Sequence, residues 1–344
     1  MEKTKTIVYA IALFFCTLGH CQVITNNQGV EPSNQRENTA VPVIFDTDIA
    51  EDYDDVGAIA TLYALEHLGE LKVLATVSSN AYETTVPTLS VLNTYFGKSN
   101  IPIGVTKRKL PSRPCTQGWA QEIIKRYPHN VTSNEEAYDA VSLYRKILAG
   151  QEDKSTTILT VGFFTNLADL LESGPDEYSE LTGVELIEKK TRLLISMAGR
   201  MQKKDAVWKE YNIKHDIPAA RLVFEKWTTP IIMSPFEVGK DILTGIPLMN
   251  NKEIINSPVK DAYRIALTKD NNKKGRMSWD QTVVLIAAKG VTPYFNSKEI
   301  DIKIKEDGTS AQIRGNRVSY LSLNQDPGKI AEIIEELMAY VPSK

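Results

Sequence analysis

The chain has 344 residues, of which 42% are hydrophobic and 24% are charged, and its formal net charge is −3. This is the composition of a globular protein that is long enough to bury a sizeable core. The slightly negative charge, with basic residues only in short clusters, excludes the positive surface of a nucleic-acid-binding protein, so we expect no nucleic-acid partner.

The first 22 residues have the pattern of a secretory signal peptide. Lys3 and Lys5 precede the apolar run IVYAIALFFCTLG, which is too short to span a bilayer comfortably. Residues 23–40 are polar and are expected to form a disordered linker. No later segment is apolar enough for a transmembrane helix, so the sequence predicts a secreted or periplasmic protein. Lipid anchoring at Cys21 is the less favoured alternative, because His20 stands where a lipoprotein signal needs a small residue.

From residue 41 onward, apolar segments typical of buried strands alternate with segments typical of helices. We expect strands at 41–45, 71–79, 101–105, 156–161, 191–199 and 229–235, and helices at 54–69, 84–97, 137–150, 164–173, 217–227 and 279–290. Continuous apolar strands separated by helices indicate a mostly parallel central sheet covered on both faces. The fold class is therefore doubly wound α/β.

The end of the chain has a different pattern. Residues 300–323 alternate around turn signals at Asp307–Gly308 and Gly315–Asn316, which predicts an antiparallel ribbon. A closing helix follows, with Asp326 as its N-cap and Pro327 at its first position. Because there is no internal repeat and no low-complexity linker, residues 41–342 are expected to form a single domain.

Six carboxylates follow the first expected strand within ten residues. They are Asp46, Asp48, Glu51, Asp52, Asp54 and Asp55. This position is the C-terminal end of a strand, where doubly wound sheets bind their ligands. The dipole of the next helix offsets the repulsion by only ~0.3–1 kcal/mol per charge, whereas a hard divalent cation offsets far more. The spacing excludes an EF-hand, because the sixth and twelfth positions from Asp46 are Glu51 and Gly57. The segment predicts a metal site, with a solvated acidic loop as the alternative.

Two known families share features with this segment. FDTDIA loosely resembles the D-x-D motif of haloacid-dehalogenase (HAD-like) phosphatases, in which Asp46 would be the nucleophile and Asp48 the general acid. Ala50 departs from that pattern. DTDIAEDYDDVGAIA more closely resembles the D-x-D-P-G-x-D-D signature of the nucleoside hydrolases of the inosine-uridine preferring type and their secreted bacterial-type relatives. Its two ends match, while its middle is two residues longer and lacks Pro-Gly.

Four further segments match the nucleoside hydrolases in order. They are TVSSNA with Asn80, ILTVGFFTNLADLL with Val161, LLISMAGRMQKKDAVWKEYN with Met197, Gly199, Glu210 and Asn212, and SWDQTVVL with Asp280. The resemblance covers about residues 41–290. It implies the nucleoside hydrolase-like fold, and the calcium-dependent hydrolysis of the N-glycosidic bond of a ribonucleoside or related ribosyl compound.

The resemblance also implies roles for the matching residues. Asp48 would be both a Ca²⁺ ligand and the general base that activates a metal-bound water. The other ligands of the Ca²⁺ would be Asp55, Asp280 and the main-chain carbonyl of Val161. The ribose would be bound by Asp54, Asn80, Met197, Glu210 and Asn212. Asp46 is expected to orient the backbone of the acidic loop, and Glu51 and Asp52 are either solvated or further ligands.

The half of the site that would receive the departing base does not follow the family pattern. Trp279 stands where many members have a His that can donate a proton; an indole cannot do this, but it can stack on an aromatic leaving group. In place of the family's Asn before EYN, the chain offers Lys203, Lys204, Asp205 and Trp208. Two alternatives therefore stay open: a HAD-like phosphatase, and a non-catalytic sugar- or metal-binding protein on the same scaffold. The natural substrate and any homo-oligomeric state are also left open.

Overall fold

The computed structural model describes residues 40–201 and 208–343. The expected signal peptide (1–22) and almost all of the expected linker (23–40) lie outside the described residues, as do Lys203, Lys204 and Asp205. Within the described part of the chain, no helix is both long enough and apolar enough to cross a membrane.

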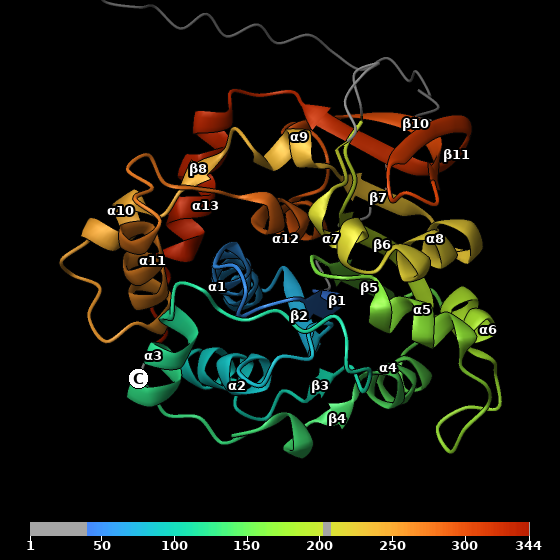
Figure 1. Cartoon of the computed structure of the whole chain (residues 1–344), viewed down its shortest axis with the longest axis horizontal. Helices are drawn as coiled ribbons and strands as arrows, with labels where there is room; N and C mark the ends of the chain where they lie inside the picture. Colours follow the sequence, from blue (N-terminus) through green and yellow to red (C-terminus); the bar gives the residue numbers. More distant parts are fainter. Residues whose placement is uncertain (1–39, 202–207, 344) are drawn as a thin grey trace, which may run out of the picture. The chain divides into compact units, whose positions relative to one another are not determined.

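The described residues are built around a nine-stranded sheet with the strand order β10-β11-β7-β6-β5-β1-β2-β3-β4 (Figure 1). The strands are β1 (Val41–Thr47), β2 (Leu71–Ser78), β3 (Ile103–Val105), β4 (Tyr138–Asp139), β5 (Thr156–Thr160), β6 (Thr191–Met197), β7 (Ile231–Ser234), β10 (Phe295–Ile304) and β11 (Ser310–Leu323). All pairings in this sheet are parallel except that of β10 with β11. The short strands β8 (Leu243–Thr244) and β9 (Arg276–Met277) pair separately. The predicted mostly parallel sheet is confirmed.

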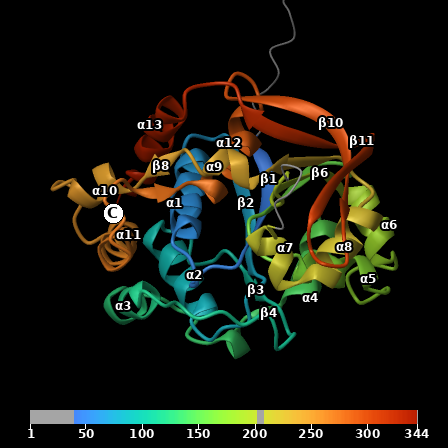
Figure 2. The same ribbon diagram turned by 45° about the horizontal axis from the view of Figure 1, so that its top comes forward.

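Helices cover both faces of the sheet (Figures 1 and 2). One face carries α1 (Asp54–His67), α2 (Thr85–Tyr95), α3 (Trp119–Arg126), α11 (Pro258–Lys269), α12 (Trp279–Lys289) and α13 (Pro327–Met338). The other carries α4 (Ala140–Ala149), α5 (Thr165–Glu172), α6 (Gly183–Lys190) and α8 (Ile217–Lys226). The shorter helices are η1 (Asn134–Glu136), α7 (Tyr211–His215), α9 (Phe236–Gly239) and α10 (Ile246–Asn250).

Each face of the sheet has its own hydrophobic core. In β1, Val43 and Phe45 belong to one cluster of buried side chains, while Ile44 between them belongs to the other. A strand that is buried on both sides is apolar at consecutive positions, which is why VPVIF reads as a continuous run.

Strand β1 is the topological switch point of the sheet. Its neighbours are β2 and β5, and the chain continues outward through β3 and β4 on one side and through β6 and β7 on the other. The helices after β1 and β5 therefore lie on opposite faces, and a crevice is left outside the C-terminal ends of these strands. The acidic segment follows β1 at this crevice.

The C-terminal ribbon differs from its prediction in one detail. The turn at Asp307–Gly308 joins β10 to β11 as expected, but Gly315–Asn316 is not a turn. It lies in a bulge of β11, where the pairing changes from Ile300–Val318 to Asp301–Ile313. The Asp301 carboxylate closes the bulge by accepting hydrogen bonds from the backbone and side chain of Arg317.

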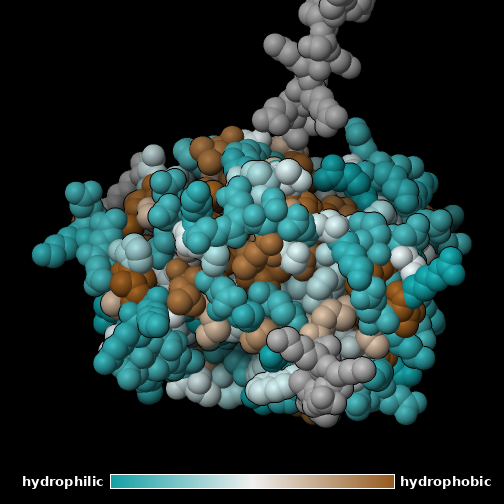
Figure 3. Space-filling view, turned by 90° about the horizontal axis from the view of Figure 1, so that it is seen from above, coloured by the Kyte–Doolittle hydropathy of each residue, from teal (hydrophilic) through white to brown (hydrophobic). Residues whose placement is uncertain are grey.

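The ribbon also joins the main sheet, since β11 pairs with β7. The closing helix α13 begins as predicted, with the Asp326 side chain accepting from the backbone N–H of Gly328. The face drawn in Figure 3 is mostly hydrophilic, and the hydrophobic residues visible on it form small separate groups. Groups of this kind are ordinary on protein surfaces and do not by themselves indicate an interface.

Candidate active site

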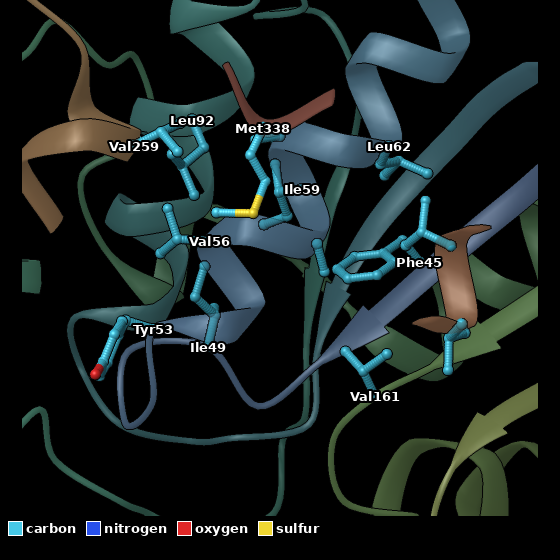
Figure 4. Packing of buried hydrophobic residues seen from close by; sticks show 14 of the residues in the cluster. Phe45, Ile49, Tyr53, Val56, Ile59, Leu62, Leu92, Val161, Val259 and Met338 are labelled. Carbon is cyan, nitrogen blue, oxygen red and sulfur yellow. The ribbon is translucent and has the colours of Figure 1, made fainter. Parts of the chain in front are cut away.

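The loop between β1 and α1 (residues 48–53, the acidic loop) is anchored in the hydrophobic core by its apolar side chains. Ile49, Ala50 and Tyr53 are fully buried, and Figure 4 shows Ile49 and Tyr53 next to Val56 of α1. The Tyr53 ring packs edge-on against Tyr263, with 5.3 Å between the ring centroids. The segment 49–53, which is two residues longer than in the family signature, is thus anchored in the core by its apolar side chains. This anchoring fixes the positions of Glu51 and Asp52.

Arginines hold the two extra acids of this loop. Glu51 accepts a hydrogen bond from Nε of Arg113 at 3.1 Å and another from the hydroxyl of Tyr211. Asp52 forms an ion pair with Arg276. Of the two roles considered for these acids, solvated side chains or further metal ligands, the structure shows neither alone: each pairs with an arginine that lies far away in the sequence.

Four aspartates meet in one pocket at the switch point. Asp48 comes from the acidic loop, Asp54 and Asp55 from the first turn of α1, and Asp280 from the first turn of α12. All four are nearly inaccessible to solvent, with exposures of 6%, 3%, 1% and 5%. Carboxylate oxygens of Asp54, Asp55 and Asp280 lie within 4.8 Å of one another. The structure thus brings together carboxylates that are more than two hundred residues apart. The group of oxygens within 4.8 Å contains Asp54, which was expected to bind ribose, and does not contain Asp48, which was expected to be a metal ligand.

The electrostatics of this group fit a hard cation. Burial, followed by repulsion from neighbouring carboxylates, raises the pKa of Asp48, Asp55 and Asp280. Burial and the charge of Asp52 raise the pKa of Asp54 to about 7, although Arg276 acts in the opposite direction. Buried carboxylates need protons or a cation to offset their charge, and an all-oxygen donor set suits Ca²⁺ or Mg²⁺.

On the side of the pocket opposite the aspartates, the side chains of Asn212 and Glu210 hydrogen-bond the ends of β5 and β6 and the start of α7. Asn212 donates from Nδ2 to the carbonyl oxygens of Val161 at 2.8 Å and Met197 at 3.1 Å. Glu210 caps α7 by accepting from the backbone N–H groups of Asn212 and Ile213, and it also accepts from that of Gly199. Val161, Met197, Glu210 and Asn212 all line the pocket, as expected of site residues. Burial raises the pKa of Glu210.

Two expected residues lie behind the pocket rather than on its wall. Asn80 is fully buried; its Nδ2 donates to the carbonyl oxygen of Asp48, and its Oδ1 accepts from the backbone N–H groups of Tyr82 and Arg113. Its amide is thus occupied by the protein, and it positions the acidic loop. The structure gives no contact surface for the expected binding of ribose by Asn80.

Asp46 has different partners from those we expected. Its carboxylate accepts from the hydroxyl of Tyr144 at 2.8 Å and from Nδ2 of Asn166 at 3.0 Å, and not from the backbone of the acidic loop. Burial raises the pKa of Asp46 to about 7. The side chain therefore anchors β1 to α4 and α5 beneath the pocket.

The rest of the pocket, which has a volume of about 400 Å³, is aromatic and basic. Trp279 donates from Nε1 to the carbonyl oxygen of Phe236, and the two rings lie 5.3 Å apart. The guanidinium of Arg200 lies 4.5 Å from the Phe236 ring and 5.0 Å from that of Trp208. Trp279 is thus on the pocket wall as predicted, and Trp208, which the sequence also offered for this half of the site, lines the same pocket. Phe236 and Arg200 are neighbours that the sequence had not indicated.

Arg276 was not among the expected site residues. It ends one of the short basic clusters, NNKKGR at residues 271–276, but its guanidinium lies in the pocket. The signal that would have found it is its place in the sequence, three residues before Trp279 and four before Asp280. A chain segment that delivers Asp280 to a site also brings the residues just before it.

Comparisons with known proteins agree with this fold. The family profile described as inosine-uridine preferring nucleoside hydrolase matches residues 43–338. Similar solved structures include a plant nucleoside hydrolase (TM-score 0.66, 18% identity), an inosine-uridine preferring nucleoside hydrolase from Bacillus anthracis (0.65, 17%) and a purine-preferring ribonucleoside hydrolase from Gardnerella vaginalis (0.65, 16%). Each alignment covers 87% of this chain and 99% of the other. No curated protein matches the chain. Because these solved structures are less than 20% identical to the chain, they show its fold. The profile match over residues 43–338 shows its family.

Proposed function

Since the chain belongs to the inosine-uridine preferring nucleoside hydrolase family, metal-dependent hydrolases that act on N-glycosyl compounds, we propose that it is a calcium-dependent enzyme that hydrolyses the N-glycosidic bond of a ribonucleoside or a related ribosyl compound. One observation carries the proposal. The buried carboxylates of Asp48, Asp54, Asp55 and Asp280 converge in one pocket at the switch point of the sheet.

The proposed calcium ion would be held by Asp48, Asp55, Asp280 and the carbonyl oxygen of Val161. That carbonyl already accepts one hydrogen bond from Asn212 and keeps a second lone pair. The ion would offset the repulsion among the carboxylates and lower the pKa of water in the pocket. Asp54, which lies in the same group of oxygens, is paired on its other side with Arg276.

The chain's own residues would carry out the remaining work. Asp48 takes a proton from the attacking water, whose oxygen forms the bond to the anomeric carbon as the bond to the base nitrogen breaks. Asp54, Glu210 and Asn212 orient the ribose hydroxyls, and their negative or polar atoms favour a ring that becomes positively charged in the transition state. Trp279 provides an aromatic face for the departing base.

The proposal is tested by measuring the release of ribose from a panel of nucleosides by the wild type and by Asp48→Asn. We expect the substitution to lower kcat/KM by about 10²-fold or more, because it removes the general base. Asp169→Asn, at a carboxylate that pairs with Arg108 away from the pocket, is the matched control and should keep wild-type activity. Turnover of no ribosylated compound by the calcium-loaded wild type would sink the proposal.

The phosphatase alternative is not supported by the geometry. Its nucleophile would be Asp46, which has no exposed surface and is hydrogen-bonded to Tyr144 and Asn166 behind the pocket. A nucleophile must reach the substrate, and this carboxylate cannot do so without a rearrangement of β1.

The non-catalytic alternative rests on Trp279, whose only side-chain N–H donates to the carbonyl oxygen of Phe236. A chain of this kind would be stabilised by ribose or a nucleoside without releasing a product. Measuring thermal unfolding and product release on the same samples distinguishes a binding protein, which is stabilised without product release, from an enzyme, which releases ribose.

We also propose that the chain is exported, which residues 1–22 suggest. Mass spectrometry of the mature N-terminus would test this, since cleavage near residue 22 is expected and an intact Met1 would contradict it.

A further inference from the structure

Three cations line the pocket on the side of Glu210 and Asn212. They are Arg200, Lys209 and Lys214. Among the described residues, none of the three forms an ion pair with a carboxylate, whereas the two arginines that hold the acidic loop both do. The need to offset the charge of the acidic loop therefore does not explain these three cations.

Arg200 is held at the pocket wall by its backbone and by its side chain. The residue before it, Gly199, donates its N–H to Glu210 and accepts a hydrogen bond from the N–H of Phe236. The guanidinium lies against the rings of Phe236 and Trp208. A guanidinium presents its donors as a planar fork that matches two oxygens of a phosphate, and little freedom is lost on binding when the fork is already oriented.

The two lysines lie next to the residues that are proposed to orient the ribose. Lys209 directly precedes Glu210, and Lys214 lies on α7 two residues after Asn212. Both lysines are exposed and line the pocket. Because a lysine ammonium is a point charge on a flexible stem, both can approach an anion bound at Arg200. The unpaired positive charge of the pocket is thus gathered on the side of the expected ribose.

We propose that these three cations bind a phosphate on the 5′-oxygen of the ribose, so that the preferred substrates are ribonucleoside 5′-monophosphates. This inference rests on the proposed function and names its substrate class. The 2′-hydroxyl adjoins the anomeric carbon and lies near the aspartates, whereas the 5′-oxygen extends from the far side of the ring. A phosphate monoester brings about −1.5 to −2 charges at pH 7, together with oxygens that several cations can share.

The phosphate takes no part in the bond that breaks. The oxygen of water forms the bond to the anomeric carbon, and its proton goes to Asp48. The N-glycosidic bond breaks with its electron pair on the base, which takes up a proton from solvent. The products are ribose 5-phosphate and the free base. Contacts with a group that does not react can hold the ribose in position for the attack, which raises kcat/KM.

The activity test compares inosine and uridine with their 5′-monophosphates by measuring release of the free base. In the wild type, kcat/KM should be at least about tenfold higher for each monophosphate, and Arg200→Gln should lower this ratio about tenfold, as expected for a charge-assisted contact. Lys209→Gln and Lys214→Gln should lower it less, because exposed charges contribute less. Added salt should also lower the ratio. A wild type that prefers the nucleosides would overturn the proposal.

Lys305→Gln is the matched control for Lys209→Gln. Hydrogen bonds from Thr309, followed by the charges of Lys305 and Lys209, lower the pKa of Asp307, so both lysines lie near the same carboxylate at the tip of the ribbon. Lys305 is not among the described residues that line the pocket. Its substitution should leave the ratio at the wild-type value. An equal fall in both variants would mean that the ratio reports only the general charge of this region, and would overturn the proposal.

Calorimetry with ribose and ribose 5-phosphate, which are not turned over, separates this proposal from the proposed function. The calcium-loaded wild type should bind ribose 5-phosphate about tenfold more tightly than ribose, and Arg200→Gln should lose most of this preference. That result would support the phosphate site even if no substrate is hydrolysed.

Two outcomes of the calorimetry would overturn the proposal. Equal binding of the two sugars by a wild type that hydrolyses inosine would support the proposed function and exclude the phosphate site. A preference for ribose 5-phosphate that is unchanged in Arg200→Gln would show that the phosphate is bound elsewhere, for example by the calcium ion.

Discussion

At the scale of single residues, the buried aspartates of the pocket affect the stability of the fold and the binding of a metal in opposite directions. Buried carboxylates that repel one another destabilise the metal-free fold, yet these groups are the ones that would bind a cation. The pKa of Asp280 is raised first by burial and then by Asp54, Asp55 and Asp48. Removing one charge should therefore have opposite effects on the metal-free and the metal-loaded protein.

We expect Asp280→Asn to raise the free energy of unfolding of the metal-free protein by ~1–3 kcal/mol, because a buried repulsive charge is removed. Calcium at a hundred times its Kd should stabilise the wild type by about 2.7 kcal/mol and the variant by much less. Denaturant unfolding with chelator and with calcium measures both. Equal stabilisation of the two proteins by calcium would contradict the role of Asp280 as a ligand.

Ala50 provides a second test at this scale. It lies in the acidic loop with a φ of 81°, where a Cβ is strained and glycine is not. Ala50→Gly should raise the free energy of unfolding by up to ~1 kcal/mol. Ala58→Gly in the middle of α1 is the control and should lower it by about 1 kcal/mol. Destabilisation of similar size by both substitutions would show that Ala50 is not strained.

At the scale of elements, the acidic loop and α7 form two sides of the pocket. The loop is held between Arg113 and Arg276, and α7 begins at Glu210, whose side chain caps it. The hydroxyl of Tyr211, the first residue of α7, donates to Glu51, so that the two sides are also linked to each other. The geometry of the pocket therefore depends on few polar contacts between elements.

His215 at the end of α7 gives this region a pH dependence. Burial, and then the charges of Arg113 and Lys214, lower its pKa from 6.5 to about 4. Its Nε2 is buried without a partner among the described residues. Below pH 6.5 the unfolded chain takes up a proton that the folded chain does not, so stability should fall as the pH drops from about 6.5 to 4.

His215→Gln should remove this part of the pH dependence. The difference in free energy of unfolding between pH 7 and pH 5 is expected to be smaller in the variant than in the wild type. His129→Gln, at a histidine in the loop after α3, is the control for a general effect of losing a histidine. If the free energy of unfolding changes between pH 7 and pH 5 by the same amount in His215→Gln as in the wild type, the proton uptake of His215 does not depend on folding.

At the scale of the whole molecule, most of the order of strands and helices could be predicted from the sequence, because most strands are apolar runs between helical segments. Helices α3, α6 and α11 and the two-residue strand β4 were not among the predicted elements. The carboxylates at the end of β1 could be placed in the site for the same reason, since ligands bind at this end of such sheets. Val161 follows β5, Met197 ends β6 and Asp280 lies in the first turn of α12, and these three elements were also predicted. They line the pocket together with Asp48.

Contacts between distant loops could not be predicted in this way. The pairing of Asp52 with Arg276 joins residues 224 positions apart, and no local pattern indicates it. Asn80 and Asp46 were placed near the site correctly, but their hydrogen-bond partners depend on backbone directions that the sequence does not encode locally. The bulge at Gly315–Asn316 looked like a turn because both use the same residues.

Titrating calcium into the metal-free wild type while measuring ribose release from inosine tests whether the hydrolysis depends on calcium at the aspartate cluster. We expect no release in the presence of chelator, and a saturable recovery of activity that reaches its plateau at one bound calcium per chain. Asp280→Asn should need far more calcium for the same rate. Ribose release that is unaffected by chelator, or none at any calcium concentration, would contradict a calcium-dependent hydrolysis at the aspartate cluster.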